Sequence, residues 1–286
     1  MFFSSTFIDA QVVINEFSAA NYSYNADNYG EYEDWIELYN TSPNSVNIGS
    51  YYISDKMNDP TKWAIPNGVT IPGNGYLIIY ASNRDEYIGG YLHTSFKITQ
   101  TKNSEAIVFS DPGGNIIDSH EIDVPNQTNH SWARTSDGGS VWGILLNPSP
   151  GAANTGVIAP YTAKPQLVPA AGFYSTLVEV SITNTDPDAT VYYTTDGTTP
   201  DENSTVYSSP FIVHSTSIVK AIAIDSDPNI PASFMDYHTY FNEHPKMADI
   251  PGTVGKLEKA LDAVLLESGH EIPASVAAAA DKTAVA

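Results

Sequence analysis

Short apolar and alternating stretches recur along the first half of this chain. Four of the six residues 12–17 are apolar, whereas Trp35–Asn40 alternates, with Ile36 and Leu38 on the face opposite Glu37. This alternation has the period of a strand. Tyr76–Tyr80 is a nearly continuous apolar run, which is typical of a strand covered on both faces. The pattern therefore predicts successive β-strands rather than helices.

Turn signals separate these stretches. Ala106–Phe109 and Ile116–Ile117 flank the sequence Ser110–Asn115, which contains Asp-Pro-Gly-Gly and indicates a β-hairpin. A Pro- and Gly-containing stretch, Asn147–Gly151, ends the pattern. Frequent turns without a helical period favour a β-sandwich or barrel over residues 12–154.

A second strand-rich region follows. Val178, Val180 and Ile182 alternate with polar residues, and Val191–Thr195 leads into the turn Asp196-Gly197. We expect residues 166–241 to form a small immunoglobulin-like sandwich. Residues 155–165 contain Gly and Pro without periodicity and predict a short linker. The overall fold class predicted is all-β, two immunoglobulin-like β-sandwiches in tandem.

The two ends of the chain differ from this pattern. Residues 1–11 combine Phe2, Phe3, Phe7 and Ile8 with small residues, and indicate either a signal-peptide remnant or an ordinary or disordered start. Residues 242–286 become rich in Ala, Leu, Lys and Glu, and from Gly252 on apolar residues recur at helical spacing. We expect a linker and a short helical tail there, which could cap a module or pair with another chain.

The composition of the chain limits the classes of binding partner that we expect. The chain has 33 acidic and 12 basic residues, a formal net charge of −21, and no cysteine. Without a basic stripe for phosphate contacts, nucleic acid is not an expected partner. No apolar run approaches the roughly 18–20 residues of a membrane span, so membrane insertion is not expected either. Polysaccharides, divalent cations, a surface protein and self-association remain open.

The ordered motifs of the first region resemble bacterial lamin-tail domains. The resemblance is carried by five stretches in the family's order: Val13–Phe17, Trp35–Asn40, Val46–Asp55, Thr70–Leu77 and Ile107–Gly113. Trp132-Ala133-Arg134 and Pro148–Asn154 complete it, and one departure is Tyr52, where a tryptophan is frequent. This resemblance implies a non-catalytic β-sandwich.

The second region resembles the immunoglobulin-like domain at the C-terminus of chitobiases and β-hexosaminidases. Ala189–Pro200 and Val219–Ala223 carry this likeness. The tandem also resembles the N-terminal part of bacterial surface proteins with a downstream spore-coat-kinase-like (CotH-type) domain, which does not follow here. The resemblances imply a secreted or cell-surface location.

No catalytic motif accompanies these modules. The seven histidines form no HxH or HExxH pair, and no GxSxG, phosphate-binding or dinucleotide-binding loop occurs. Glu16 and Glu37 are a carboxylate pair on strands, but both occupy ordinary positions in the lamin-tail resemblance. We therefore expect no enzymatic activity, no catalytic residue and no organic cofactor.

Two weaker candidates for binding remain. Asp27, Glu31, Glu33 and Asp34 could hold calcium through oxygen ligands, although their spacing matches no EF-hand loop. Tyr192 and Tyr193 could contact a ligand, and because they are adjacent on a strand we expect one to face the core. We expect most of the four tryptophans to be core residues.

Three functions follow as hypotheses. The first is a binding or scaffold module of an exported bacterial surface protein, contacting glycans or matrix. The second is a self-assembling structural subunit joined through the C-terminal helix or a free sheet edge. The third is an accessory region of a CotH-type kinase-like or hydrolytic enzyme.

Overall fold

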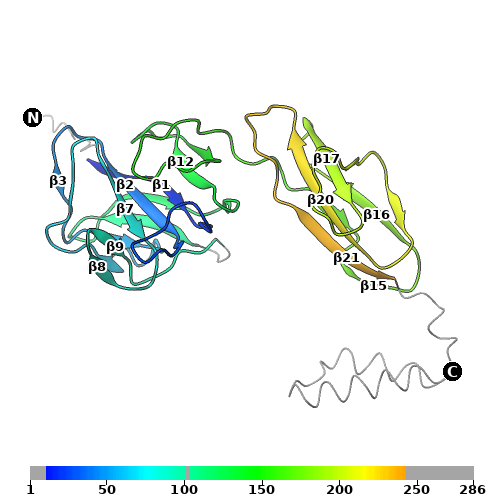
Figure 1. The fold of residues 1–286 in the computed structure, drawn as a ribbon, viewed down its shortest axis with the longest axis horizontal. Coiled ribbons are helices and arrows are strands. Elements are labelled where there is room, and N and C mark those ends of the chain that lie inside the picture. Colours follow the sequence, from blue (N-terminus) through cyan, green and yellow to red (C-terminus); the bar gives the residue numbers. More distant parts are fainter. Residues whose placement is uncertain (1–10, 101–103, 243–286) are drawn as a thin grey trace, which may run out of the picture. The chain divides into compact units, whose positions relative to one another are not determined.

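The computed structural model describes residues 11–100 and 104–242, and this part of the chain is all-β, as predicted (Figure 1). The predicted signal remnant, apart from Gln11, and the predicted helical tail lie outside the described residues. Two compact units are formed. The first contains the described residues up to Ala163 together with Ile224–Phe234, and the second contains Lys164–Ala223 and the described residues from Met235 to Asn242. No helix of the described part is long and apolar enough to cross a membrane.

The first unit is a sandwich built around a seven-stranded sheet with the order β13-β12-β1-β2-β7-β9-β8. Its strands are β1 (Val12–Ser18), β2 (Trp35–Asn40), β7 (Tyr76–Tyr80), β8 (Glu86–Ile88), β9 (Tyr91–His93), β12 (Ser131–Arg134) and β13 (Trp142–Leu145). All pairings in it are antiparallel except β7 with β9. The central strand β1 is buried along its whole length, as its apolar sequence predicts.

A four-stranded sheet, β11-β10-β4-β5, forms the other layer of the first unit, and β3 pairs with β6 beside it. The strands are β3 (Val46–Asn47), β4 (Tyr52–Ser54), β5 (Trp63–Ala64), β6 (Thr70–Ile71), β10 (Ala106–Ser110) and β11 (Ile116–Glu121). Ile14, Ile36 and Leu38 of the first sheet share one core with Ile53 and Phe109 of the second. Burial of alternating apolar residues from both layers is what holds the sandwich together.

The second unit is a smaller sandwich of a three-stranded sheet, β14-β16-β19, and a five-stranded sheet, β15-β21-β20-β17-β18. The strands are β14 (Gln166–Val168), β15 (Gly172–Tyr174), β16 (Val178–Thr183), β17 (Ala189–Thr194), β18 (Thr205–Val206), β19 (Phe211–Val213), β20 (Ser217–Asp225) and β21 (Asp236–Asn242). Val180, Val219, Ala221 and Tyr240 are central to its core.

The predicted linker, residues 155–165, is largely part of the first unit. Ile158 exchanges two backbone hydrogen bonds with Ile144 of β13, at 3.0 and 2.9 Å. Tyr161 packs against the first core, and its hydroxyl accepts a hydrogen bond from the backbone N–H of Gln127. These irregular contacts have no sequence period, so only the structure reveals that the first unit continues to Ala163.

Candidate functional site

A loop with four exposed tyrosines joins β1 to β2. We call residues Asn21–Asp34 the tyrosine loop. Its exposed side chains are Tyr22 (71%), Tyr24 (47%), Tyr29 (47%) and Tyr32 (47%). Exposed tyrosine amid Asn, Ser and Gly is the composition of antibody binding loops, in which the rings supply rigid, amphipathic contact area.

The loop is organised by the side chain of Asn21, which is buried. Its Oδ1 accepts hydrogen bonds from the backbone N–H groups of Tyr24 and Asn25, both at 3.2 Å. Its Nδ2 donates to the carbonyl oxygens of Asn25 and Glu33, at 2.7 and 2.8 Å. One buried amide therefore joins the beginning of the loop to its end and limits the conformations that the tyrosines can adopt.

Neighbouring segments hold both sides of the loop. Tyr29 donates its hydroxyl proton to Glu86 at 2.7 Å, and the Arg84 guanidinium lies 4.5 Å from the centre of the Tyr29 ring. On the other side, Asn129 Oδ1 accepts hydrogen bonds from the backbone N–H groups of Tyr22 and Ser23. Because the backbone is held in this way, the exposed rings are presented with little freedom left to lose on binding.

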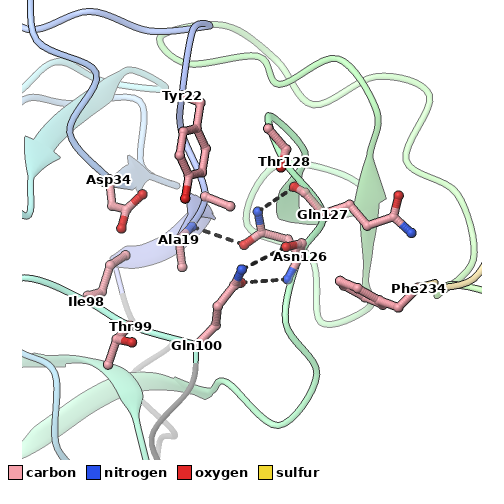
Figure 2. Close-up of a pocket in the computed structure, with 11 residues that line it drawn as sticks. Ala19, Tyr22, Asp34, Ile98, Thr99, Gln100, Asn126, Gln127, Thr128 and Phe234 are labelled. Atoms are coloured by element: carbon pink, nitrogen blue, oxygen red, sulfur yellow. Dashed lines mark hydrogen bonds between the residues drawn. The ribbon is translucent and has the colours of Figure 1, made fainter. Parts of the chain in front are cut away.

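Two hollows open beside Tyr22. The first, which we call the Tyr22 hollow, measures about 530 Å³, and Figure 2 shows Tyr22 and Asp34 on one side of it and Phe234 on the other. The second, the Tyr32 hollow, measures about 340 Å³. The two hollows share Ala19, Ala20, Tyr22 and Asp34 as lining residues. The tyrosine loop thus supplies side chains to two adjoining depressions.

The floor of the Tyr22 hollow consists of amides that satisfy one another (Figure 2). Asn126 is buried; its Oδ1 accepts from Ala19 N–H at 3.0 Å, and its backbone exchanges two hydrogen bonds with the Gln100 side chain, at 2.8 and 2.9 Å. These hydrogen-bonded amides are part of the structural framework of the Tyr22 hollow. Polar contacts to a ligand would come instead from the exposed Thr128 and from the Asp34 carboxylate.

Asp34 is the acidic group common to both hollows. One of its oxygens accepts a hydrogen bond from Asn21 N–H at 3.1 Å. Burial, assisted by the charge of Glu33, raises the pKa of Asp34 to about 6, and Lys97 acts in the opposite direction. The carboxyl group is therefore mostly ionised at neutral pH and protonated in mild acid.

The four residues predicted as calcium ligands all lie in the tyrosine loop, but they have separate roles. Asp27 Oδ1 closes a turn by accepting from the N–H groups of Tyr29 and Glu31, at 2.8 and 2.9 Å. Glu33 forms an ion pair with Lys97 at 2.7 Å. No three histidine, aspartate or glutamate side chains of the described residues are arranged to hold a metal ion. Calcium binding stays a prediction.

The predicted ligand pair, Tyr192 and Tyr193, lies in β17 of the second unit. The Tyr193 ring stacks on Phe211 with ring centres 4.4 Å apart and packs against the second core. Tyr192 is half-buried on the opposite face of the strand. Neither residue belongs to the tyrosine loop. The signal that points to that loop is a cluster of Tyr, Asn, Ser and Gly between two predicted strands.

Three of the four tryptophans are buried, as predicted. Trp35, Trp63 and Trp132 are 0%, 5% and 8% exposed, and Trp142 is partly buried against the same core. All four lie in the first unit. Their fluorescence therefore reports on the folding of that unit alone.

A separate group of acids, Glu16, Glu37 and Asp137, forms what we call the carboxylate network. The register of β1 shifts between Ile14 and Glu16, so Asn15 sits in a β-bulge. Asn15 Nδ2 donates to Glu37 Oε1 and to Asp137 Oδ1, each at 3.0 Å. The bulge thus aims the Asn15 side chain at two of the three acids.

The network binds the segment that ends the lamin-tail-like sequence. We call residues 147–154 the closing segment. Glu16 accepts hydrogen bonds from the N–H and hydroxyl groups of Ser149, at 3.0 and 2.9 Å, and from the Ser131 hydroxyl at 2.6 Å. Glu37 Oε2 accepts from Gly151 N–H at 2.6 Å. Both glutamates are 0% exposed and bonded to the closing segment, so their arrangement is that of a structural clasp.

Comparison with known proteins agrees with the two sequence resemblances. Residues 8–123 match the family model of the Lamin Tail Domain, and residues 169–233 match that of the Chitobiase/beta-hexosaminidase C-terminal domain. Among solved structures, fibronectin(III)-like modules of Clostridium thermocellum CbhA are 14% identical to this chain, with 82% of this chain and 96% of that chain covered and a TM-score of 0.22. No curated protein matches the chain.

Proposed function

We propose that this chain is a non-catalytic binding module, and that the tyrosine loop with its two hollows contacts a glycan. The observation that carries the proposal is the set of four exposed tyrosines on a loop held by hydrogen bonds at both sides. A tyrosine ring offers an apolar face and a hydroxyl group, which suits the apolar faces and hydroxyl groups of a sugar.

Charge and shape support a neutral, hydroxyl-rich ligand. Asp34, Glu31 and Glu33 line the Tyr32 hollow, and Lys97, its one lysine, pairs with Glu33. Nucleic acid would be repelled by such a surface. The hollows are shallow and open, so they fit part of an extended polymer better than a small molecule that must be enclosed. The name of the second matched family also refers to enzymes of hexosamine-containing glycans.

We also propose that the chain is located at the cell surface or in the surrounding medium. The support is the acidic composition and the resemblance to surface-protein modules. Fractionation of producing cells, with an antibody against the chain, would measure its distribution. A pool confined to the cytoplasm would contradict this part of the proposal.

Tyr22→Ala is expected to weaken glycan binding by about ten-fold or more, because exposed aromatic anchors contribute most of the energy of such contacts. The measurement is titration calorimetry of the full chain with the strongest ligand from a polysaccharide panel. Tyr87→Ala is the matched control, since Tyr87 is 50% exposed in the same unit but lies in β8 outside both hollows. An equal effect of the two substitutions, or no binding to any polysaccharide, would contradict the proposal.

A further inference from the structure

One broad face of the second unit carries exposed apolar side chains. In β21, Tyr240 is buried in the second core, so Tyr237 and Phe241 point to the opposite side of the sheet, where they are 65% and 40% exposed. Phe173 of the edge strand β15 is paired with Phe241 and is 73% exposed. We call the side of the five-stranded sheet that is turned away from the second core the aromatic face. Its defining residues are Phe173, Tyr237, Phe241 and Ile218.

The side chains of the aromatic face are held by strands rather than by loops. The rings of Phe173 and Phe241 stack on each other, with centres 4.6 Å apart and planes inclined by 16°. Tyr237 lies four residues before Phe241 in β21, which places it about 14 Å away along the strand. Its partner on β20 is Lys220. Because the sheet fixes the backbone at each of these positions, a ligand that contacts them restricts little remaining motion.

The aromatic face lacks the acidic character of the chain as a whole. Within β15, β20 and β21, the residues that point to this side include one lysine, Lys220, and no aspartate or glutamate. The outer side of the other sheet differs, because Glu179 of β16 lies there beside Ile212 of β19. The aromatic face also carries hydrogen-bonding groups, the Tyr237 hydroxyl and Thr239. This composition favours an uncharged partner that offers apolar surface and hydroxyl groups.

The size of the aromatic face decides between two classes of partner. A five-stranded sheet is about 19 Å wide, and with about 14 Å between Tyr237 and Phe241 the face covers roughly 300 Å². A stable protein–protein interface buries about 800 Å² on each partner. A second copy of the chain docked here would therefore be held too weakly. A polysaccharide needs no such area, because each aromatic side chain contributes a separate contact with a sugar ring.

We propose that the aromatic face binds the surface of an insoluble, uncharged polysaccharide, in which sugar rings lie side by side. A broad, open sheet surface does not enclose a single soluble chain as a cleft does, but it contacts several rings of a packed array at once. Phe173 contributes the ring face that is not covered by Phe241. This binding goes beyond the proposed function, because it uses the second unit and not the tyrosine loop.

Depletion of the full chain from solution by microcrystalline cellulose and by insoluble chitin measures this binding. Phe173→Ala and Tyr237→Ala are compared with Ile212→Ala, the matched control. Ile212 is 41% exposed on β19, an edge strand of the other sheet of the same unit. Every chain in the comparison, including the reference, also carries Tyr22→Ala, so that the tyrosine loop contributes equally throughout. Calorimetric melting, which detects both units, verifies folding.

We expect Phe173→Ala and Tyr237→Ala each to lower the association constant about ten-fold on at least one of the two polysaccharides, and Ile212→Ala to leave it unchanged. Equal constants for the three variants, or no depletion by either polysaccharide, would overturn the proposal while leaving the binding of soluble glycans by the tyrosine loop unaffected. Sedimentation that shows a dimer of the reference chain and a monomer of Phe173→Ala would also overturn it, and would assign the aromatic face to a second copy.

Discussion

Replacing Glu16 by alanine is expected to destabilise the first unit by about 2–3 kcal/mol, because it removes the acceptor of buried hydrogen-bond donors. The substitution leaves two donors without their acceptor, the Ser131 hydroxyl and the Ser149 N–H, while the Ser149 hydroxyl keeps Asn154 Oδ1 as an acceptor at 3.1 Å. It also empties a site that is 0% exposed. The closing segment loses its bonds to Glu16 but keeps the hydrogen bond from Asn154 Nδ2 to the Asn15 carbonyl of β1, so strand and segment should loosen around Ser149.

Urea unfolding followed by tryptophan fluorescence measures this loss, since all four tryptophans report on the first unit. Glu121→Ala is the matched control, because Glu121 lies on β11 of the same unit and is exposed. Its unfolding midpoint should stay that of the unsubstituted chain. A loss below about 1 kcal/mol for Glu16→Ala would show that the closing segment is held by other contacts.

The second large effect is a loss of stability as the pH rises from about 6.5 to 8.5. Burial raises the pKa of Glu37 to about 8 from an ordinary value of 4.5, with the neighbouring Glu16 and Asp137 acting in the same direction. The folded state therefore keeps a proton that the unfolded state releases above pH 4.5. Stability from this group is complete below that pH and is lost progressively up to about pH 8.

Burial also raises the pKa of Glu16, which therefore acts in the same direction as Glu37, whereas His120 and Asp34 contribute little in this window. Burial lowers the pKa of His120 to about 4, so His120 makes folding more favourable as the pH rises toward 6.5 and changes little above it. Asp34 has a pKa of about 6, so most of the stability that is lost through its ionisation is already lost at pH 6.5. Since one pKa unit corresponds to about 1.4 kcal/mol, the unit should lose about 2 kcal/mol between pH 6.5 and 8.5.

Thermal unfolding followed by tryptophan fluorescence at several pH values measures this slope. Glu37→Gln is the informative variant, because it removes the titrating group while keeping the shape of the side chain. It should lose some stability at pH 6, where one hydrogen bond to Asn15 or Gly151 is missing, but its melting temperature should be nearly level from pH 6.5 to 8.5. If the melting temperature of Glu37→Gln falls with pH as steeply as that of the unsubstituted chain, another group causes the pH dependence.

The positions of the strands could be predicted from the local pattern of apolar and polar residues. The alternation in Trp35–Asn40 placed Ile36 and Leu38 in the core, and the turn after Ser110 marked the β10–β11 hairpin. Such features depend on neighbours in the sequence, so the chain displays them directly.

The carboxylate network could not be read in that way. Glu16 and Glu37 were placed on strands, yet their partners Ser149 and Gly151 come from a turn-rich stretch more than 100 residues later, with no periodicity to link them. The same applies to the Tyr22 hollow, which is lined by residues from four distant segments: Ala19, Gln100, Asn126 and Phe234. The acids of the tyrosine loop suggested a metal site; hydrogen bonds within the loop account for Oδ1 of Asp27, whereas its Oδ2 is buried without a hydrogen-bond partner, 4.0 Å from His93 Nδ1.

The most direct test of the proposed binding surface is an amide NMR titration of the ¹⁵N-labelled full chain with the strongest glycan of the panel. We expect shift changes to concentrate in Asn21–Asp34 and in the hollow walls at 97–100 and 126–128. Shift changes centred on Tyr192 and Tyr193, or a spectrum unchanged at saturating glycan, would contradict it.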